Sequence, residues 1–106
     1  VYARDLGQYE RAIQDFDEAI RLNPQDADAY YNRGTTYAKD LDEYERAMKD
    51  FDDAIRLDRQ DAIAYGNRGL AYHYLGQYER AIQDYDEAIR LNPQYAEAYY
   101  NRGAAY

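Results

Sequence analysis

One stretch of twenty residues occurs twice in the chain with a single difference. Residues 6–25 read LGQYERAIQDFDEAIRLNPQ, and residues 75–94 repeat them with Tyr85 in place of Phe16. A third, more divergent copy covers residues 41–60, so successive copies start 35 and 34 residues apart. A period of this length is typical of repeat proteins, in which each unit buries its apolar face on its neighbours. We therefore expect a stack of similar units and no single central core.

Each copy carries the pattern of an amphipathic helix, called the B-type helix below. Over residues 9–22 the apolar side chains fall at i, i+3, i+4 and i+7, which predicts one buried stripe. The other face is charged. We expect Asp15, Asp17 and their copies to be solvated there, and Asp17 to form a surface pair with Arg21 that recurs as Asp52/Arg56 and Asp86/Arg90. An Asn-Pro pair ends the first and third copies, because the residue before a proline is pushed out of the α region. Arg59 replaces that proline in the middle copy, which leaves the middle helix free to run further.

A second helical pattern, called the A-type helix, occupies residues 27–37, 62–72 and 96–106. It contains a glycine at the same place in all three copies, although glycine inside a helix costs about 1 kcal/mol relative to alanine. We infer that only a hydrogen atom fits there, because the A-type helix approaches its own B-type helix closely. The constant positions of the pattern are Ala29/Ala64/Ala98, Tyr30/Tyr65/Tyr99, Gly34/Gly69/Gly103 and Tyr37/Tyr72/Tyr106.

Short connections join each A-type helix to the following B-type helix, which predicts antiparallel helical hairpins. Gly7 and Gly76 suit the left-handed residue that often closes a helix, and Asp42 tolerates that conformation at the matching place in the middle copy. The first two of these turns are one residue longer than the third. We expect the extra residue to form a bulge at Arg4–Asp5 and at Lys39–Asp40.

The composition narrows the function classes. A net charge of −8 works against binding a nucleic-acid backbone or an anionic membrane, since both need clustered positive charge. The chain has no cysteine and no serine, so disulfides, thiolate zinc sites and Ser- or Cys-type catalytic triads are excluded. His73 is the only histidine, and we interpret it as a groove-edge or interface residue. We therefore expect no enzyme activity, no cofactor and no metal site, and the compartment stays unknown, with the cytoplasm as the favoured expectation.

The unit made by an A-type and a B-type helix resembles the tetratricopeptide repeat family. The resemblance extends over essentially the whole chain in period, helix order and alternation of small and large residues. It rests on Tyr30, Gly34, Tyr37, Ala47, Phe51 and Ala54 in one unit and on Tyr65, Gly69, Tyr72, Ala81, Tyr85, Ala88 and Pro93 in the next. It implies an all-α fold, an α-solenoid of antiparallel helix pairs in a right-handed superhelix. Residues 1–26 and 96–106 would then be partial repeats, and residues 27–61 and 62–95 full repeats.

The chain departs from the family pattern at a few positions. Tyrosine replaces tryptophan at the first large position, and the family's frequent leucine is replaced by Arg33, Arg68 and Arg102.

The resemblance also implies a non-enzymatic scaffold that binds a protein or peptide segment in a concave groove lined by the A-type helices. Tyrosines in such a groove are typical hot-spot residues. The asparagines would either bond a peptide backbone or bond within their own repeat interfaces, and both readings stay open. The residues expected to bind are Tyr31, Asn32, Thr35, Asn67, Leu70, His73, Tyr74, Tyr100 and Asn101.

One subfamily clamps the C-terminal carboxylate of chaperone tails with lysines and a second asparagine. Here the positions expected to carry the lysines hold Tyr31, Gly66 and Tyr100, and the second-asparagine position holds threonine or leucine. Asp28 and Glu97 would in addition repel acidic tails. We therefore expect a neutral or basic, partly apolar segment as the partner.

A runner-up function is structural self-assembly. The first B-type helix lacks most of its A-type partner and the last A-type helix lacks its B-type partner, as expected of a piece cut from a longer protein. We expect residues 96–106 of one molecule to pack on residues 9–22 of the next, giving a head-to-tail homo-oligomer. The alternative is that residues 1–6 or the last helix fold back over the exposed surface. The contact would use Tyr9, Ile13, Phe16 and Ile20 on one side and Tyr99, Gly103 and Tyr106 on the other.

Overall fold

The computed structural model describes the backbone of residues 3–106 and the side chains from residue 7 onward. Every regular element in this part of the chain is helical, as the sequence predicts. The B-type helices are α1 (Ala3–Leu22), α3 (Tyr44–Leu57) and α5 (Tyr78–Leu91), and the A-type helices are α2 (Ala27–Thr35), α4 (Ala62–Tyr74) and α6 (Ala96–Ala105). A π-helical turn, Thr36–Asp40, continues α2.

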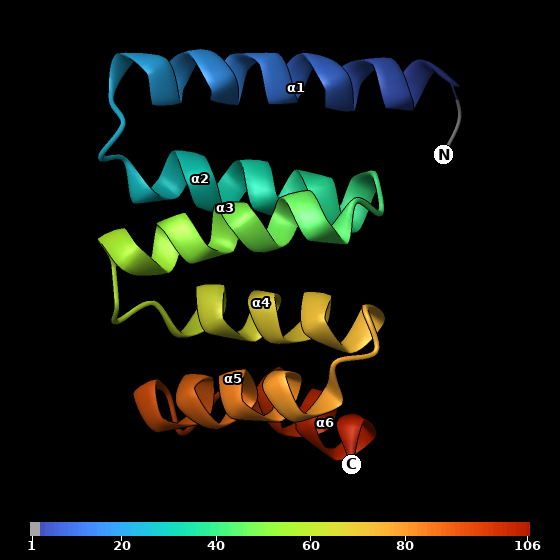
Figure 1. The fold of residues 1–106 in the computed structure, drawn as a ribbon, viewed down its shortest axis with the longest axis vertical. Coiled ribbons are helices and arrows are strands. Elements are labelled where there is room, and N and C mark those ends of the chain that lie inside the picture. The colour runs from blue at the N-terminus through green and yellow to red at the C-terminus, as the bar shows by residue number, and fades with distance from the viewer. Residues whose placement is uncertain (1–2) are drawn as a thin grey trace.

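The helices stack in chain order, each against the one before it (Figure 1). The pairs α2/α3 and α4/α5 form antiparallel hairpins, α1 packs on α2, and α6 packs on α5. The stack measures 35 × 32 × 21 Å. The prediction of an all-α solenoid built from antiparallel pairs is confirmed.

Each hairpin is closed by an aromatic ring that faces a glycine. A Cβ atom placed on Gly34 would lie 2.9 Å from Cε1 of Phe51, and one on Gly69 would lie 2.8 Å from Cε1 of Tyr85. Both rings are fully buried. The inference that only hydrogen fits is confirmed at these two glycines. At Gly103 a Cβ would meet no atom of another element within 4 Å among the described residues.

The two turns between paired helices take the predicted forms. Asp42 and Gly76 are left-handed, with φ angles of 55° and 78°. The extra residue of the first full hairpin is absorbed by the π-helical turn, which is closed by the bond from the Leu41 N–H to the Thr36 carbonyl at 3.2 Å. A π-helical turn holds one residue more than an α-helical turn. The bulge expected at Lys39–Asp40 is confirmed.

The start of the chain differs from the sequence prediction. The helix α1 runs without a break through Gly7, so the left-handed residue expected there and the bulge expected at Arg4–Asp5 are wrong. No A-type helix packs on this side of α1 among the described residues. A turn would therefore gain no packing, while a continued helix keeps its backbone hydrogen bonds. Residues 3–6 extend past the end of α2 and do not fold back (Figure 1), and Val1 and Tyr2 lie outside the described residues.

The end of α3 also differs from the prediction. We expected this helix to run further because Arg59 replaces a proline, but it ends at Leu57, the place that matches Leu22 and Leu91. Asp58 adopts an extended conformation and its side chain accepts a hydrogen bond from the Gln60 N–H at 3.1 Å. Asn23 and Asn92 make the same bond. The Asx turn ends the helix, and the proline is not required.

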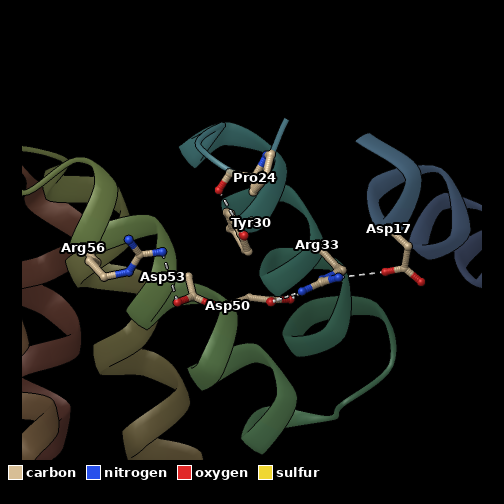
Figure 2. Close-up of polar contacts among 7 residues, drawn as sticks. All are labelled: Asp17, Pro24, Tyr30, Arg33, Asp50, Asp53 and Arg56. Carbon is tan, nitrogen blue, oxygen red and sulfur yellow. Dashed lines mark hydrogen bonds and ion pairs between the residues drawn. The ribbon is translucent and has the colours of Figure 1, made fainter. Parts of the chain in front are cut away.

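In α2 and in α4, one arginine joins three helices. Arg33 of α2 donates from Nε and Nη2 to Asp50 of α3, at 2.9 and 2.7 Å, and from Nη1 to Asp17 of α1 at 2.8 Å (Figure 2). Arg68 repeats this bridge with Asp84 of α5 and Asp52 of α3. Each bridge thus connects one A-type helix to its own B-type helix and to the preceding one.

These bridges overturn the predicted surface pairs. Asp17, Asp52 and Asp86 bond to the arginine of the next A-type helix, whereas the three arginines that were expected to pair with them bond to the residue one position later. The observed pairs are Arg21/Glu18, Arg56/Asp53 and Arg90/Glu87. The i, i+4 rule considers only residues on the same helix, so it cannot identify a partner on another helix.

The aspartates at the centre of the bridges are buried. Asp50 is 2% exposed and Asp84 is 5% exposed, so the expectation of a solvated face is wrong at these two positions. Burial raises the pKa of both carboxyls, although the arginines partly offset it. The hydrogen bonds to these carboxylates in turn raise the pKa of Arg33 and Arg68. Arg33 and Arg68 also lie over the rings of Tyr30 and Tyr65.

The three glycines of the A-type helices should respond differently to alanine. We expect Gly34→Ala and Gly69→Ala to destabilise the fold, because the added methyl meets a buried ring. Gly103→Ala should stabilise it by up to about 1 kcal/mol, because the position is open and alanine favours the helix. Urea denaturation of the three variants measures the difference, and a loss of stability in all three would contradict this account.

Removal of one partner from the buried bridge should destabilise the fold far more than removal of one partner from a surface pair. We expect Arg33→Leu to lower the free energy of unfolding by about 3 kcal/mol, because it leaves Asp50 buried without its cation. The double variant Arg33→Leu/Asp50→Leu should recover most of this loss. The control Asp53→Ala, which breaks the 3.7 Å pair between a half-buried aspartate and the exposed Arg56, should stay within about 1 kcal/mol of wild type. Equal effects of the two single variants in urea denaturation would refute the bridge as a buried ion pair.

Candidate functional site

The A-type helices form one continuous face, called the A-helix face here. The Asn67 amide of α4 donates to the Tyr31 hydroxyl of α2 at 2.9 Å, and α4 also contacts α6. Side chains from neighbouring units therefore meet along this face.

Two adjacent hollows lie on the A-helix face. The first hollow, of about 230 Å³, lies between the two hairpins and is lined by Ala38, Lys39, Asp42, Tyr44, Phe51, Asn67, Leu70, Ala71 and Tyr74. The second hollow, of about 190 Å³, lies between α4, α5 and α6 and is lined by Leu70, His73, Tyr74, Tyr85, Tyr100, Asn101 and Ala104. Leu70 and Tyr74 line both, so the two hollows are neighbours.

Most of the residues expected in the groove lie at these hollows. Asn67, Leu70 and Tyr74 line the first hollow, and Leu70, His73, Tyr74, Tyr100 and Asn101 line the second. Tyr74 and Tyr100 are 60% and 78% exposed, so their rings are available to a partner.

The remaining three expected residues lie outside the hollows. The Tyr31 hydroxyl accepts the hydrogen bond from the Asn67 amide, and the Tyr31 ring centroid lies 6.1 Å from that of Phe51. Asn32 is exposed, and Thr35 is half-buried with a buried hydroxyl that has no hydrogen-bond partner among the described residues.

The asparagines at matching positions of the three A-type helices therefore differ in their bonding. Asn67 already uses its amide N–H within the fold, to bond a tyrosine of the preceding unit. Asn32 and Asn101 make no side-chain hydrogen bond to another described residue, so their amides are open to a ligand.

Two tyrosines of the hollows were missed by the sequence reasoning. Tyr44 stacks on Tyr74 with ring centroids 5.0 Å apart and an interplanar angle of 16°, and its hydroxyl donates to Asp42 at 3.2 Å. Burial is the main cause that raises the pKa of the Tyr44 phenol. Tyr44 begins a B-type helix at the place of Tyr9 and Tyr78, so the repeat pattern assigned it to packing.

Tyr85 is the second missed residue. Its ring fills the core against Gly69, while its hydroxyl is buried and has no hydrogen-bond partner among the described residues. Burial raises the pKa of this phenol well above its usual range. The other two B-type helices carry phenylalanine at this position, so the hydroxyl is an addition that packing does not need. The signal was visible in the sequence as the one difference between the duplicated stretches.

His73 lies among aromatic rings. It makes edge contacts with Tyr78 and Tyr74, with centroid distances of 5.1 and 5.8 Å. Within the part of the chain that the structure describes, no group of acidic or histidine side chains is arranged to hold a metal ion. No helix among these residues combines the length and apolarity needed to cross a membrane.

The lysine positions of a carboxylate clamp are occupied differently here. At Gly66 the space for a side chain is filled by Tyr95, since a Cβ would lie 2.9 Å from the Tyr95 hydroxyl oxygen. Asp28 and Glu97 stand in the first turns of α2 and α6 and place negative charge at the same end of the A-helix face. Among the described residues that line the two hollows, Lys39 is the only lysine or arginine, and Asp42 lines the same hollow.

A stack of antiparallel helix pairs that presents such a face defines the class of helical-repeat scaffolds. The profile of the TPR repeat family matches residues 3–40, 39–76 and 69–106, and the chain therefore belongs to the tetratricopeptide repeat family. Domains of this family are protein–protein interaction modules and are typically non-enzymatic.

Solved structures agree with this assignment. The first TPR of Spaghetti (RPAP3), bound to the HSP90 peptide SRMEEVD, is 28% identical with a TM-score of 0.90, over 95% of this chain and 79% of that one. The second TPR domain of human RPAP3, in complex with the HSP70 peptide SGPTIEEVD, is 33% identical with a TM-score of 0.88, over 95% and 83%. MamA is 29% identical with a TM-score of 0.90, over 97% of this chain and 60% of that one. No curated protein sequence matches the chain.

The unbonded hydroxyl of Tyr85 gives a stability prediction. We expect Tyr85→Phe to raise the free energy of unfolding by about 1 kcal/mol, because it removes a buried hydroxyl that has no partner. Tyr30→Phe is the matched control and should lower stability, because the Tyr30 hydroxyl donates to the Pro24 carbonyl at 3.2 Å. Urea denaturation measures both changes, and a destabilised Tyr85→Phe variant would mean that the hydroxyl has a structural partner.

Proposed function

We propose that this chain is a non-enzymatic scaffold that binds a peptide or an extended protein segment across the two hollows of the A-helix face. The observation that carries the proposal is the pair of adjacent, tyrosine-lined hollows with exposed Tyr74 between them and Tyr100 at the edge. Tyrosine offers a large apolar surface with a polar tip and is enriched at binding hot spots.

The size of the hollows favours a peptide over a cofactor. At about 230 and 190 Å³, each is smaller than the roughly 300–1,000 Å³ typical of small-molecule sites. Each volume suits one or two side chains. In an extended segment, alternate side chains point the same way at about 7 Å spacing, so two of them would enter neighbouring hollows.

The charges favour a neutral or basic, partly apolar segment. Both RPAP3 domains are described with peptides that end in Glu-Glu-Val-Asp. In this chain the clamp positions hold Tyr31, Gly66 and Tyr100, and Asp28 and Glu97 add negative charge to the same face. Net charge of −8 adds a long-range bias toward cationic partners.

Binding to an immobilised library of short peptides tests the proposal. We expect selection of sequences with aromatic or aliphatic residues at alternate positions and with Lys or Arg nearby. Tyr100→Ala should weaken the best of them about tenfold or more, as hot-spot truncation does. Tyr106→Ala is the control, because Tyr106 is equally exposed but lines neither hollow, and it should bind as wild type does.

Two outcomes would contradict the proposal. Equal binding by Tyr100→Ala and wild type would exclude the second hollow as the site. Preference for SRMEEVD over the same peptide with lysines in place of its acidic residues would overturn the proposed charge of the partner.

A further inference from the structure

Aromatic rings from three helices converge on the second hollow. His73 and Tyr74 of α4 and Tyr100 of α6 line it, and the buried ring of Tyr85 on α5 forms its inner wall. The rings of His73 and Tyr74 stand at 83° to each other with centroids 5.8 Å apart, so they form two walls of a corner. The other lining residues are apolar apart from Asn101. The hollow is therefore bounded mainly by aromatic rings.

Packing of the repeats does not require the rings of His73, Tyr74 and Tyr100. The matching positions around the first hollow hold alanine, lysine and glycine, at residues 38, 39 and 66, and the helices there pack in the same way. Three aromatic side chains gathered at one place, none of them needed by the repeat, indicate a surface that serves binding.

Two walls of the second hollow are held in place by other rings. Tyr44 stacks on Tyr74 with centroids 5.0 Å apart, and Tyr44 itself lines only the first hollow. His73 makes an edge contact with Tyr78, with centroids 5.1 Å apart. The walls are thus fixed before a ligand arrives, which lowers the entropy cost of binding.

The electrostatics of the second hollow favour a cation. No lysine or arginine is among the described residues that line it, whereas Lys39 lines the first hollow. The face of an aromatic ring carries negative potential and attracts a cation within about 6 Å of its centroid. Burial raises the pKa of the Tyr85 phenol, and the Glu97 carboxylate adds to this effect, so negative charge also lies near the hollow.

The shape and lining of the hollow select among organic cations. A planar guanidinium stacks on a single ring face, and the primary ammonium of lysine is strongly hydrated. No aspartate or glutamate among the described residues lines this hollow to replace that hydration. A quaternary ammonium group is rounded and has no N–H to satisfy, so it can contact walls at right angles to each other without losing hydrogen bonds.

We propose that the second hollow binds the trimethylammonium group of an N-trimethylated lysine in the bound segment. This inference rests on the proposed function, because a segment that lies across the A-helix face brings such a residue to the hollow. The first hollow, with Phe51 and Leu70 in its lining and Lys39 to repel a cation, then takes an apolar side chain. The two hollows therefore fix the order in which the side chains of the segment bind.

Tetramethylammonium chloride is the probe for the hollow itself, and tert-butanol is its neutral counterpart of similar size. The titration is followed by NMR at about pH 8, above the range in which histidine side chains take up a proton. We expect tetramethylammonium to shift the signals of His73, Tyr74 and Tyr100 and to bind roughly 5- to 30-fold more tightly than tert-butanol.

Variants of Tyr100 show whether the ring is responsible. Tyr100→Phe keeps the ring and should keep the preference for the cation. Tyr100→Leu keeps an apolar side chain without a ring and should lower that preference severalfold. Tyr106→Leu is the control, because Tyr106 is exposed but lines neither hollow, and it should bind both probes as wild type does.

Peptides test the occupant. Each position of the best library peptide is replaced in turn by lysine, by arginine, by trimethyl-lysine and by the neutral analogue in which carbon replaces the ammonium nitrogen. We expect one position at which trimethyl-lysine binds roughly 5- to 30-fold more tightly than the neutral analogue. Tyr100→Leu should remove this gain, and Tyr106→Leu should not. Vesicles of phosphatidylcholine, which carry the same cation on a lipid, should not bind.

Each contrary result overturns a different part of the inference. Equal binding of the cation and its neutral counterpart, for either pair of probes, would refute the cation pocket while peptide binding itself stands. A larger gain from lysine or arginine would refute the quaternary cation. Vesicle binding that Tyr100→Leu abolishes would refute the peptide as its source. A chain that prefers tetramethylammonium but binds no peptide would overturn the proposed function and, with it, trimethyl-lysine as the occupant.

Discussion

The stack depends on one arginine per unit, placed where its planar guanidinium reaches two B-type helices at once. A leucine at this position would fill the space between the helices, but its contacts are not directional and would not fix the orientation of one helix relative to another. The guanidinium has a fixed fork of donors, and its bidentate bond to Asp50 or Asp84 sets the rotation of the A-type helix against its partner. Its remaining donor reaches the preceding helix and thereby couples neighbouring units. Since the stability of a repeat protein is a sum of unit and interface terms, a residue that acts in both affects every layer.

The buried ion pairs contribute more to selecting one packing arrangement of the helices than to the free energy of folding. Taking the two groups out of water costs several kcal/mol for each ion, and the ion pair recovers this only with good geometry. The gain here is that a slipped or rotated packing would leave Asp50 or Asp84 buried without a cation. The aromatic ring against glycine enforces the same register by shape, because Phe51 and Tyr85 fit only where the opposing helix has no Cβ. Shape and charge thus select the same arrangement.

The sequence predicts the features that depend on residues close together in the chain and that recur from repeat to repeat. The period, the glycines, the left-handed turns and the extra residue at Lys39–Asp40 are all local in this sense. The arginine bridges join residues 16 or 17 positions apart on separate helices, and rules for charges on a single helix assigned Asp17 to Arg21 instead. The straight course of α1 was missed for a related reason, since the turn at Gly76 is stabilised by the packing of α4 on α5 and not by the glycine alone.

The two hollows are lined largely by positions that differ between the copies, such as Tyr74 and Tyr100. The duplicated stretch contributes mainly to the packing of the B-type helices, with one exception. The single difference within that stretch, Tyr85 for Phe16, nevertheless places a hydroxyl at the second hollow. That hydroxyl is buried, so it changes the polarity behind the wall of the hollow and not the surface that a partner would meet. The surface of the second hollow is set by positions that vary between the copies, among them the exposed Tyr74 and Tyr100.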